Sequence, residues 1–336
     1  MARVPRFARR LLPVIATALA SAVAASPAGA AGHTDAAQVK PSPNAGIVDI
    51  YTKLGYENGA AAGTGMILTR SGEVLTNNHV IQGATHFRVV DVTTHRSYAA
   101  NVVGYSVARD VGVLQLVNAS RLQTIRLGNS GLAHVGQKVV ARGNALGRGG
   151  APRVASGKVT ALHRQITASD GVGDSELLSD LIETDAKVVP GDSGGPLENA
   201  RGRAIGMVTA GSTGLGSRGY AIPIDHALSL ARQIVAGKTS AIVHVGATAF
   251  LGVGVEDASG GGAQITDVVQ GSAAEAAGLA TGDVITSLNG ASISSGADVR
   301  KTVLSLTPGV AVPVDWTDSA GAAHTGTITP ASGPPQ

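Results

Sequence analysis

The chain has 336 residues, of which 43% are hydrophobic and 15% charged, with 46 glycines and only 3% aromatic residues. This composition argues against an intrinsically disordered chain and favours two or three folded domains with a mainly β body. The net charge of +3 gives no case for a nucleic-acid partner, because no dense Lys/Arg stripe appears. With no cysteines, stability must come from burial rather than disulfides.

Residues 1–30 are typical of a secretory signal. Its basic head contains Arg3, Arg6, Arg9 and Arg10. An apolar stretch from Leu11 to Ala25 and a small-residue cleavage site at Ala28 to Ala30 follow. Because the stretch is short and contains Pro13, we favour export over the alternative, an uncleaved anchor. Removal would leave 22 Lys and Arg against 23 Asp and Glu in residues 31–336.

The next region is expected to begin flexibly and then form many strands. Residues 31–46 are polar and contain prolines, so we expect a flexible segment. From Ile47 to about Pro223, short apolar runs alternate with glycines, which is typical of a sandwich or barrel. These runs include TGMILT, HFRVVDV, VGVLQLV, QKVVARG and AIGMVTA.

A helix is predicted in the segment PIDHALSLARQIVAGK. Asp225 can cap its N-terminus and Gly237 can end it. Its apolar face contains Leu228, Ala231, Ile234 and Val235. Residues 237–248 indicate a linker, and a second strand-rich unit begins at AFLGVGV.

The second unit contains two predicted helices. Ser272 and Glu275 form a capping box at the first, which Gly278 ends. A strand, DVITSL, and a turn at Asn289-Gly290 follow. The second helix, around Ala297 to Leu306, has an apolar stripe of Val299, Val303 and Leu306. We interpret this stripe as core in preference to a binding face.

The segment PGDSGGPL, residues 190–197, contains the strongest candidate nucleophile, Ser193. A serine hydroxyl needs an imidazole to take its proton and a carboxylate to orient the imidazole. His79 follows an apolar strand in VLTNNHVIQ, and Asp110 precedes one in ARDVGVLQL. The order His, Asp, Ser is one in which the triad recurs.

Other residues are considered as the acid, as oxyanion donors and as metal ligands. Asp91 and Asp49 also lie near strands but lack the context of Asp110. Gly191 permits the positive φ that would aim its own amide and that of Ser193 at one oxyanion. The histidines show no metal-ligand spacing and cysteines are absent, so we expect no metal and no cofactor.

Four segments together resemble the HtrA/DegP family of exported serine proteases. These are TNNHV, RDVGVLQL, ETDAKVVPGDSGGPL and GYAIPI. The second unit, with FLGV and GLATGDVITSLNG, is similar to the PDZ domain that follows the protease in that family. The resemblance covers roughly residues 47 to 330.

The resemblance implies a protease domain at 47–236, a linker at 237–248 and a PDZ (α+β) domain at 249–331. The protease domain would be a chymotrypsin-like pair of six-stranded β-barrels with the active site between them. His79 would be the general base, Asp110 its orienting acid, Ser193 the nucleophile, and the amides of Gly191 and Ser193 the oxyanion hole. Met207, Val208 and Thr209 would be the strand that pairs with substrate.

In the PDZ domain, the loop Phe250, Leu251, Gly252 and Val253 would bind a peptide C-terminus while the peptide adds a strand to the sheet. The groove's other wall would be the helix with Val299 and Val303. A domain that only packs on the protease is the alternative.

The sequence departs from the family pattern at three places. Asp192 stands where the family usually has Asn, which adds a negative charge beside the nucleophile. The stretch GNALGRGGAPRV replaces an apolar-aromatic version common in the family, and the loop before GTGMIL is short. These departures put loop regulation in doubt more than catalysis.

The resemblance implies an exported, ATP-independent endopeptidase that acts on unfolded or misfolded proteins in quality control, often as a homotrimer. A latent protease that serves as a chaperone or peptide-binding scaffold is the alternative. An esterase is disfavoured, because the G-x-S-x-G elbow belongs to folds with the order Ser, Asp, His. Activity should fall as the pH drops through about 6.5, where an unperturbed histidine becomes protonated.

Overall fold

The computed structural model describes residues 42–56, 59–169, 175–211 and 218–336. The predicted signal and most of the expected flexible segment lie outside these residues. Residues 43–46, however, form a turn rather than a loose lead. Ala45 is buried, and a Cβ on Gly46 would lie 2.0 Å from the backbone nitrogen of Ile125. The packed chain therefore begins slightly before the predicted first strand.

The first barrel consists of antiparallel strands in the order β5-β4-β1-β2-β3-β6, closed by pairing of β5 with β6. Its strands are β1 (Ile47–Leu54), β2 (Gly59–Ile67), β3 (Glu73–Thr76), β4 (His86–Asp91), β5 (Ser97–Ser106) and β6 (Val111–Leu116). A short strand, β13 (His244–Val245), pairs with β5. Part of the segment predicted as a linker is thus an edge strand of this sheet.

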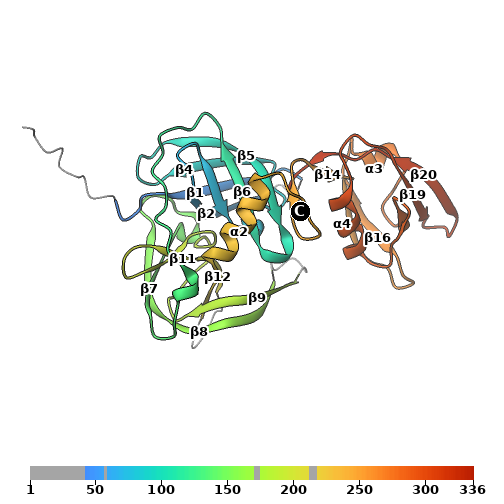
Figure 1. The fold of residues 1–336 in the computed structure, drawn as a ribbon. Helices are drawn as coiled ribbons and strands as arrows, with labels where there is room; N and C mark the ends of the chain where they lie inside the picture. Colours follow the sequence, from blue (N-terminus) through green and yellow to red (C-terminus); the bar gives the residue numbers. More distant parts are fainter. Residues whose placement is uncertain (1–41, 57–58, 170–174, 212–217) are drawn as a thin grey trace, which may run out of the picture. The chain divides into compact units, whose positions relative to one another are not determined.

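The second barrel is closed in the order β10-β11-β12-β9-β8-β7. Its strands are β7 (Lys138–Gly143), β8 (Arg153–Ser169), β9 (Ser175–Thr184), β10 (Pro196–Asn199), β11 (Ala204–Gly211) and β12 (Gly219–Pro223). Each predicted apolar run coincides with a strand of one of the two barrels, as Figure 1 shows in blue to yellow-green. The prediction of a mainly β fold with two six-stranded barrels is confirmed.

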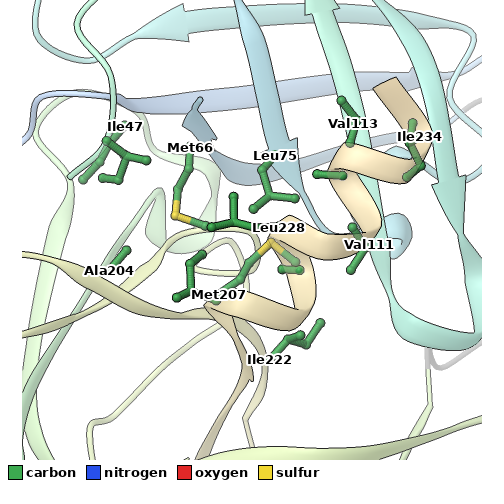
Figure 2. Close-up of a cluster of buried hydrophobic side chains, with 14 of the residues drawn as sticks. Ile47, Met66, Leu75, Val111, Val113, Ala204, Met207, Ile222, Leu228 and Ile234 are labelled. Atoms are coloured by element: carbon green, nitrogen blue, oxygen red, sulfur yellow. The ribbon is translucent and has the colours of Figure 1, made fainter. Parts of the chain in front are cut away.

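A single hydrophobic core joins the barrels. Met66, Leu75 and Val111 from the first barrel belong to the same buried cluster as Met207 and Ile222 from the second. Figure 2 shows the helix α2 (Ile224–Val235) crossing this cluster, with Leu228 and Ile234 among its side chains. Burial of apolar side chains from both barrels holds their facing surfaces together.

Two predicted details of α2 are wrong. Asp225 does not cap the helix: its carboxylate accepts hydrogen bonds from the amide and hydroxyl of Ser130, at 2.8 and 2.7 Å. Pro223 occupies the N-cap instead. Val235 is 44% exposed, so the buried face ends at Ile234. Gly237, with φ of +69°, lies just beyond the C-cap as predicted.

The C-terminal unit is built on a sheet of order β15-β16-β17-β19-β20, with β18 (Ala291–Ser292) beside β17. Its other strands are β15 (Val253–Asp257), β16 (Ala263–Val268), β17 (Val284–Leu288), β19 (Val312–Thr317) and β20 (Ala323–Ile328). A separate pair is formed by β14 (Thr248–Phe250) and β21 (Ala331–Gly333).

Two helices complete this unit, α3 (Ala273–Ala276) and α4 (Gly296–Ser305). Ser272 caps α3 as predicted, since its hydroxyl accepts a hydrogen bond from the Glu275 amide at 3.3 Å. Val299 and Val303 of α4 are buried in the unit's core, as is Leu306 just after the helix. The interpretation of this stripe as core is confirmed.

Candidate active site

His79 lies in the first turn of α1 (Asn78–Ile81), directly after β3. Its ring atom Nδ1 is 3.0 Å from both carboxylate oxygens of Asp110, and its backbone amide donates to Asp110 Oδ1 at 3.0 Å. A carboxylate only accepts hydrogen bonds, so Nδ1 carries the proton of the neutral ring. Nε2 is then the basic nitrogen, directed away from the carboxylate.

Asp110 is held in place by several donors from different elements. It follows the 3-10 turn Val107–Arg109 in a left-handed conformation, with φ of +48°, and is 1% exposed. Its Oδ2 also accepts a hydrogen bond from the Thr209 hydroxyl, and its carbonyl accepts one from the Asn77 side chain at 2.9 Å. A buried carboxylate with this many donors has a fixed orientation.

Ser193 lies in the turn between β9 and β10, on the second barrel. Its hydroxyl donates to the carbonyl of Thr209 at 3.3 Å. Thr209 therefore contacts both the carboxylate of Asp110 and the hydroxyl of Ser193. The structure thus connects all three sequence-predicted triad residues, and it adds Thr209 in a role that the sequence did not indicate.

The peptide groups beside Ser193 are oriented by hydrogen bonds to their carbonyls. The Pro190 carbonyl accepts from the Leu146 amide at 2.7 Å, and the Asp192 carbonyl accepts from the Gly195 amide at 3.0 Å. In a trans peptide the N–H points opposite to the C=O. The amides of Gly191 and Ser193 therefore point away from these two carbonyl partners, as donors for an oxyanion must.

Gly191 is required at its position for two reasons. Its φ is +93°, which residues with a side chain rarely adopt, and a Cβ there would lie 2.2 Å from the carbonyl oxygen of Asn144. Its own carbonyl accepts a hydrogen bond from the Thr64 hydroxyl at 2.7 Å. The glycine thus lets this turn pack directly on β2 and on the segment after β7.

In the C-terminal unit, Leu251 and Gly252 lie between β14 and β15. The Leu251 carbonyl accepts from the Ala274 amide and the Gly252 carbonyl from the Val269 amide, each at 2.9 Å. The amides of Gly252 and Val253 consequently point the opposite way. In the described part of the chain β15 pairs with β16 alone, so its other edge is open.

Comparison with known proteins identifies the family of this chain. The family model for a trypsin-like peptidase domain matches residues 63–207, and that for a PDZ domain matches residues 249–317. The serine protease PepD of Mycobacterium tuberculosis is 34% identical over 340 residues, which cover 94% of this chain and 69% of PepD. The chain belongs to the HtrA/DegP family of serine proteases.

Other members of the HtrA family are also similar to this chain. The periplasmic pH-dependent serine endoprotease DegQ of Escherichia coli is 35% identical over 266 residues, covering 74% of this chain and 55% of DegQ. The solved structure of the HtrA-type protease AlgW with a tripeptide is 28% identical, with a TM-score of 0.50 over 88% of this chain and 99% of that chain. Against several of these relatives, this chain spans about half of their length.

Asp192, which differs from the usual residue of the HtrA family, has a buried carboxylate with partners of its own. The Asp192 side chain is 2% exposed, and its Oδ2 accepts from the Val189 amide at 3.0 Å and from Arg153 Nη1 at 3.2 Å. Burial raises the pKa of this carboxyl, while the Val189 amide and Arg153 act to lower it. The added negative charge is therefore paired inside the fold.

The prediction that Met207 and Val208 form the substrate strand does not match the backbone pairing. Met207 is flanked by Pro196 and Ile222, and Val208 already bonds the segment 194–195 through both its amide and its carbonyl. Their backbones are therefore occupied. A register shift follows between Val208 and Ala210. Beyond it, the Thr209 carbonyl accepts from the Ser193 hydroxyl.

The described residues contain no cluster of His, Asp or Glu suited to a metal ion. They also contain no helix that is both long and apolar enough to cross a membrane.

Proposed function

We propose that this chain is an exported endopeptidase that cleaves unfolded or misfolded proteins through an acyl-enzyme. The contact network around Asp110 is the observation that supports the proposal most. One buried carboxylate holds the ring and the backbone of His79 and the hydroxyl of Thr209, whose carbonyl in turn accepts from Ser193. Acid, base and nucleophile thus belong to one hydrogen-bonded set.

In the proposed reaction, the Ser193 hydroxyl first breaks its hydrogen bond to the Thr209 carbonyl. His79 Nε2 then takes the hydroxyl proton as Oγ attacks the substrate carbonyl carbon. The resulting oxyanion accepts hydrogen bonds from the amides of Gly191 and Ser193. His79 then gives its proton to the leaving amine as the C–N bond breaks. A water, deprotonated by His79, then attacks the acyl carbon. The bond from this carbon to Ser193 Oγ breaks, His79 returns the proton to Oγ, and the acid product leaves.

Substrate is proposed to lie as an added strand along Thr209 to Gly211, the part of β11 beyond the positions that pair with β10. This places the substrate strand two residues later than the segment Met207 to Thr209. The proposal rests on the pairing of Met207 with Pro196 and on the bonds of Val208 to the segment 194–195.

The C-terminal unit is proposed to bind peptide C-termini. The amides of Gly252 and Val253 would hold the terminal carboxylate, and the peptide would pair with the open edge of β15. The first turn of α4 is tied to this strand, because the Gly296 amide donates to Asp257 at 2.8 Å. Calorimetric titration with a peptide and with its C-terminal amide tests this, since only the free carboxylate should bind.

The remaining assignments follow the family. We propose cleavage of residues 1–30 as a signal, a protease domain at 47–236, a linker at 237–248 that includes β13, and a PDZ domain at 249–331. We also propose action outside the cytoplasm, as the names of the periplasmic relatives suggest. A homotrimer is the assembly we expect, and light scattering measures it.

Fragment release from denatured casein by residues 31–336 tests the activity. Ser193→Ala should lose at least about 10³-fold in rate. Ser229→Ala, an exposed serine on α2, is the matched control and should cleave normally. Equal cleavage by Ser193→Ala and the parent would exclude Ser193 as the nucleophile. Suppressed aggregation without fragments would favour the scaffold alternative.

A further inference from the structure

One side chain donates hydrogen bonds to two positions of the turn that supplies the oxyanion hole. Arg153, the first residue of β8, donates from Nη1 to the Lys187 carbonyl at 2.6 Å and to Asp192 Oδ2 at 3.2 Å. These two acceptors lie at opposite ends of the segment 187–192. Ser193 follows this segment directly, and Gly191 lies within it.

Asp192 depends on this contact. Among the described residues, Arg153 is the only cation in an ion pair with Asp192, and Asp192 Oδ1 has no hydrogen-bond partner. A buried carboxylate without a cation is strongly unfavourable. Without Arg153, this side chain would have to take up a proton or turn toward water.

The Asp192 side chain has little room to rotate inside the fold. Asp192 packs against Gly143 at the end of β7, where a Cβ would lie 2.5 Å from Asp192 Cα and 2.9 Å from Oδ1. A movement of the side chain toward water must therefore involve the backbone of the turn. Asp192 lies between Gly191 and Ser193, so a backbone rotation there changes the direction of both oxyanion amides.

Two of the departures of this sequence from the family pattern thus contact each other through the ion pair of Arg153 with Asp192. Arg153 belongs to the unusual stretch GNALGRGGAPRV, and Asp192 replaces the usual neutral Asn. We propose that Arg153 is a positioning residue for the oxyanion hole, required because Asp192 is charged. This proposal rests on the proposed protease activity. It predicts that Arg153 becomes dispensable once Asp192 is neutral.

Four variants of the full mature chain test the proposal: Arg153→Met, Asp192→Asn, the double variant, and Arg148→Met. Arg148 is an exposed arginine of the same stretch whose side chain has no partner among the described residues, so it is the matched control. The measured quantities are kcat and KM on a peptide substrate, and the midpoint of thermal unfolding.

Arg153→Met should lower kcat about 10²-fold, the loss typical of removing an oxyanion donor, with KM changed less than about threefold. Asp192→Asn and Arg148→Met should stay near the parent. The double variant should recover to within about tenfold of the parent. A merely structural role would lower the unfolding midpoint without this selective loss of kcat.

Two results would overturn the proposal: parental kcat in Arg153→Met, or a double variant as inactive as Arg153→Met. If Arg153→Met does not fold, the double variant alone decides, because it should still fold and cleave. Failure of the protease proposal is distinguishable, since the parent itself would then show no cleavage that depends on Ser193.

Discussion

Thr209 donates its hydroxyl to Oδ2 of the buried Asp110 and accepts the Ser193 hydroxyl with its carbonyl. One contact uses the side chain and the other the backbone carbonyl of the same residue, so Thr209 links the positions of Asp110 and Ser193. Because Thr209 belongs to β11, this link is tied to the second barrel.

Replacement of Thr209 by Val should impair catalysis by removing the donor to Asp110. A hydrogen bond to a charged group contributes about 1.5–3 kcal/mol, so we expect kcat/KM to fall roughly 10- to 150-fold. Thr209→Ser keeps the hydroxyl and should retain most activity. Steady-state kinetics of both variants measure the effect, and equal losses would show that shape rather than the donor matters.

Gly191→Ala should abolish the oxyanion hole. The added Cβ meets the Asn144 carbonyl at 2.2 Å and the residue must keep φ at +93°, so the turn has to move. We expect kcat to fall about 10²-fold or more. Gly202→Ala also has a positive φ, of +64°, but open space around it, and therefore controls for backbone strain alone. Activity of Gly191→Ala near that of the control would contradict this role.

The buried Asp49 should make stability depend on pH. Burial raises its pKa from 3.8 to about 6, against the opposing effects of Arg88 and the Gly150 amide, and its Oδ1 has no partner among the described residues. Between these values the folded state binds more protons than the unfolded state. This contribution to stability is present below about pH 4 and is lost as the pH rises through about 6.

Asp49→Asn should therefore be more stable than the parent above pH 6, by up to about 3 kcal/mol. The difference should vanish below about pH 4. Urea unfolding of both proteins from pH 4 to 8 measures it. A difference that does not change with pH would mean that Asp49 is not buried as a costly charge.

Met207→Ala distinguishes a core residue from a substrate contact. The side chain is fully buried in the core between the barrels, so truncation should cost about 2–5 kcal/mol of unfolding free energy. At temperatures where the variant is folded, KM should be close to that of the parent. A large rise in KM with unchanged stability would restore Met207 to the substrate strand.

The connection among the three triad candidates could be predicted because each lies in a short, specific motif next to a strand. His79, Asp110 and Ser193 needed no knowledge of register. The predicted substrate strand does not match the backbone pairing because the irregularity after Val208 cannot be read from an apolar run such as AIGMVTA. An alternating pattern gives the buried face of a strand but not where its partner strand ends.

Contacts between residues distant in sequence account for the other differences. Asp225 has the composition of a helix cap, but Ser130 offers two donors to it. The partner of Asp192 was likewise not predictable, since Arg153 is one of several arginines in the chain and only the closure of the barrel brings it there. Local propensity is a weak prior where tertiary contacts compete.

The shared core of the two barrels has a consequence for how rigid the protease domain is when it binds different substrate proteins. Because side chains from both barrels and from α2 belong to one buried cluster, the two barrels should unfold together. We therefore expect the protease domain to melt in a single calorimetric transition. The relative position of the two barrels is then a fixed property, so we expect the substrate rather than the enzyme to adapt its shape.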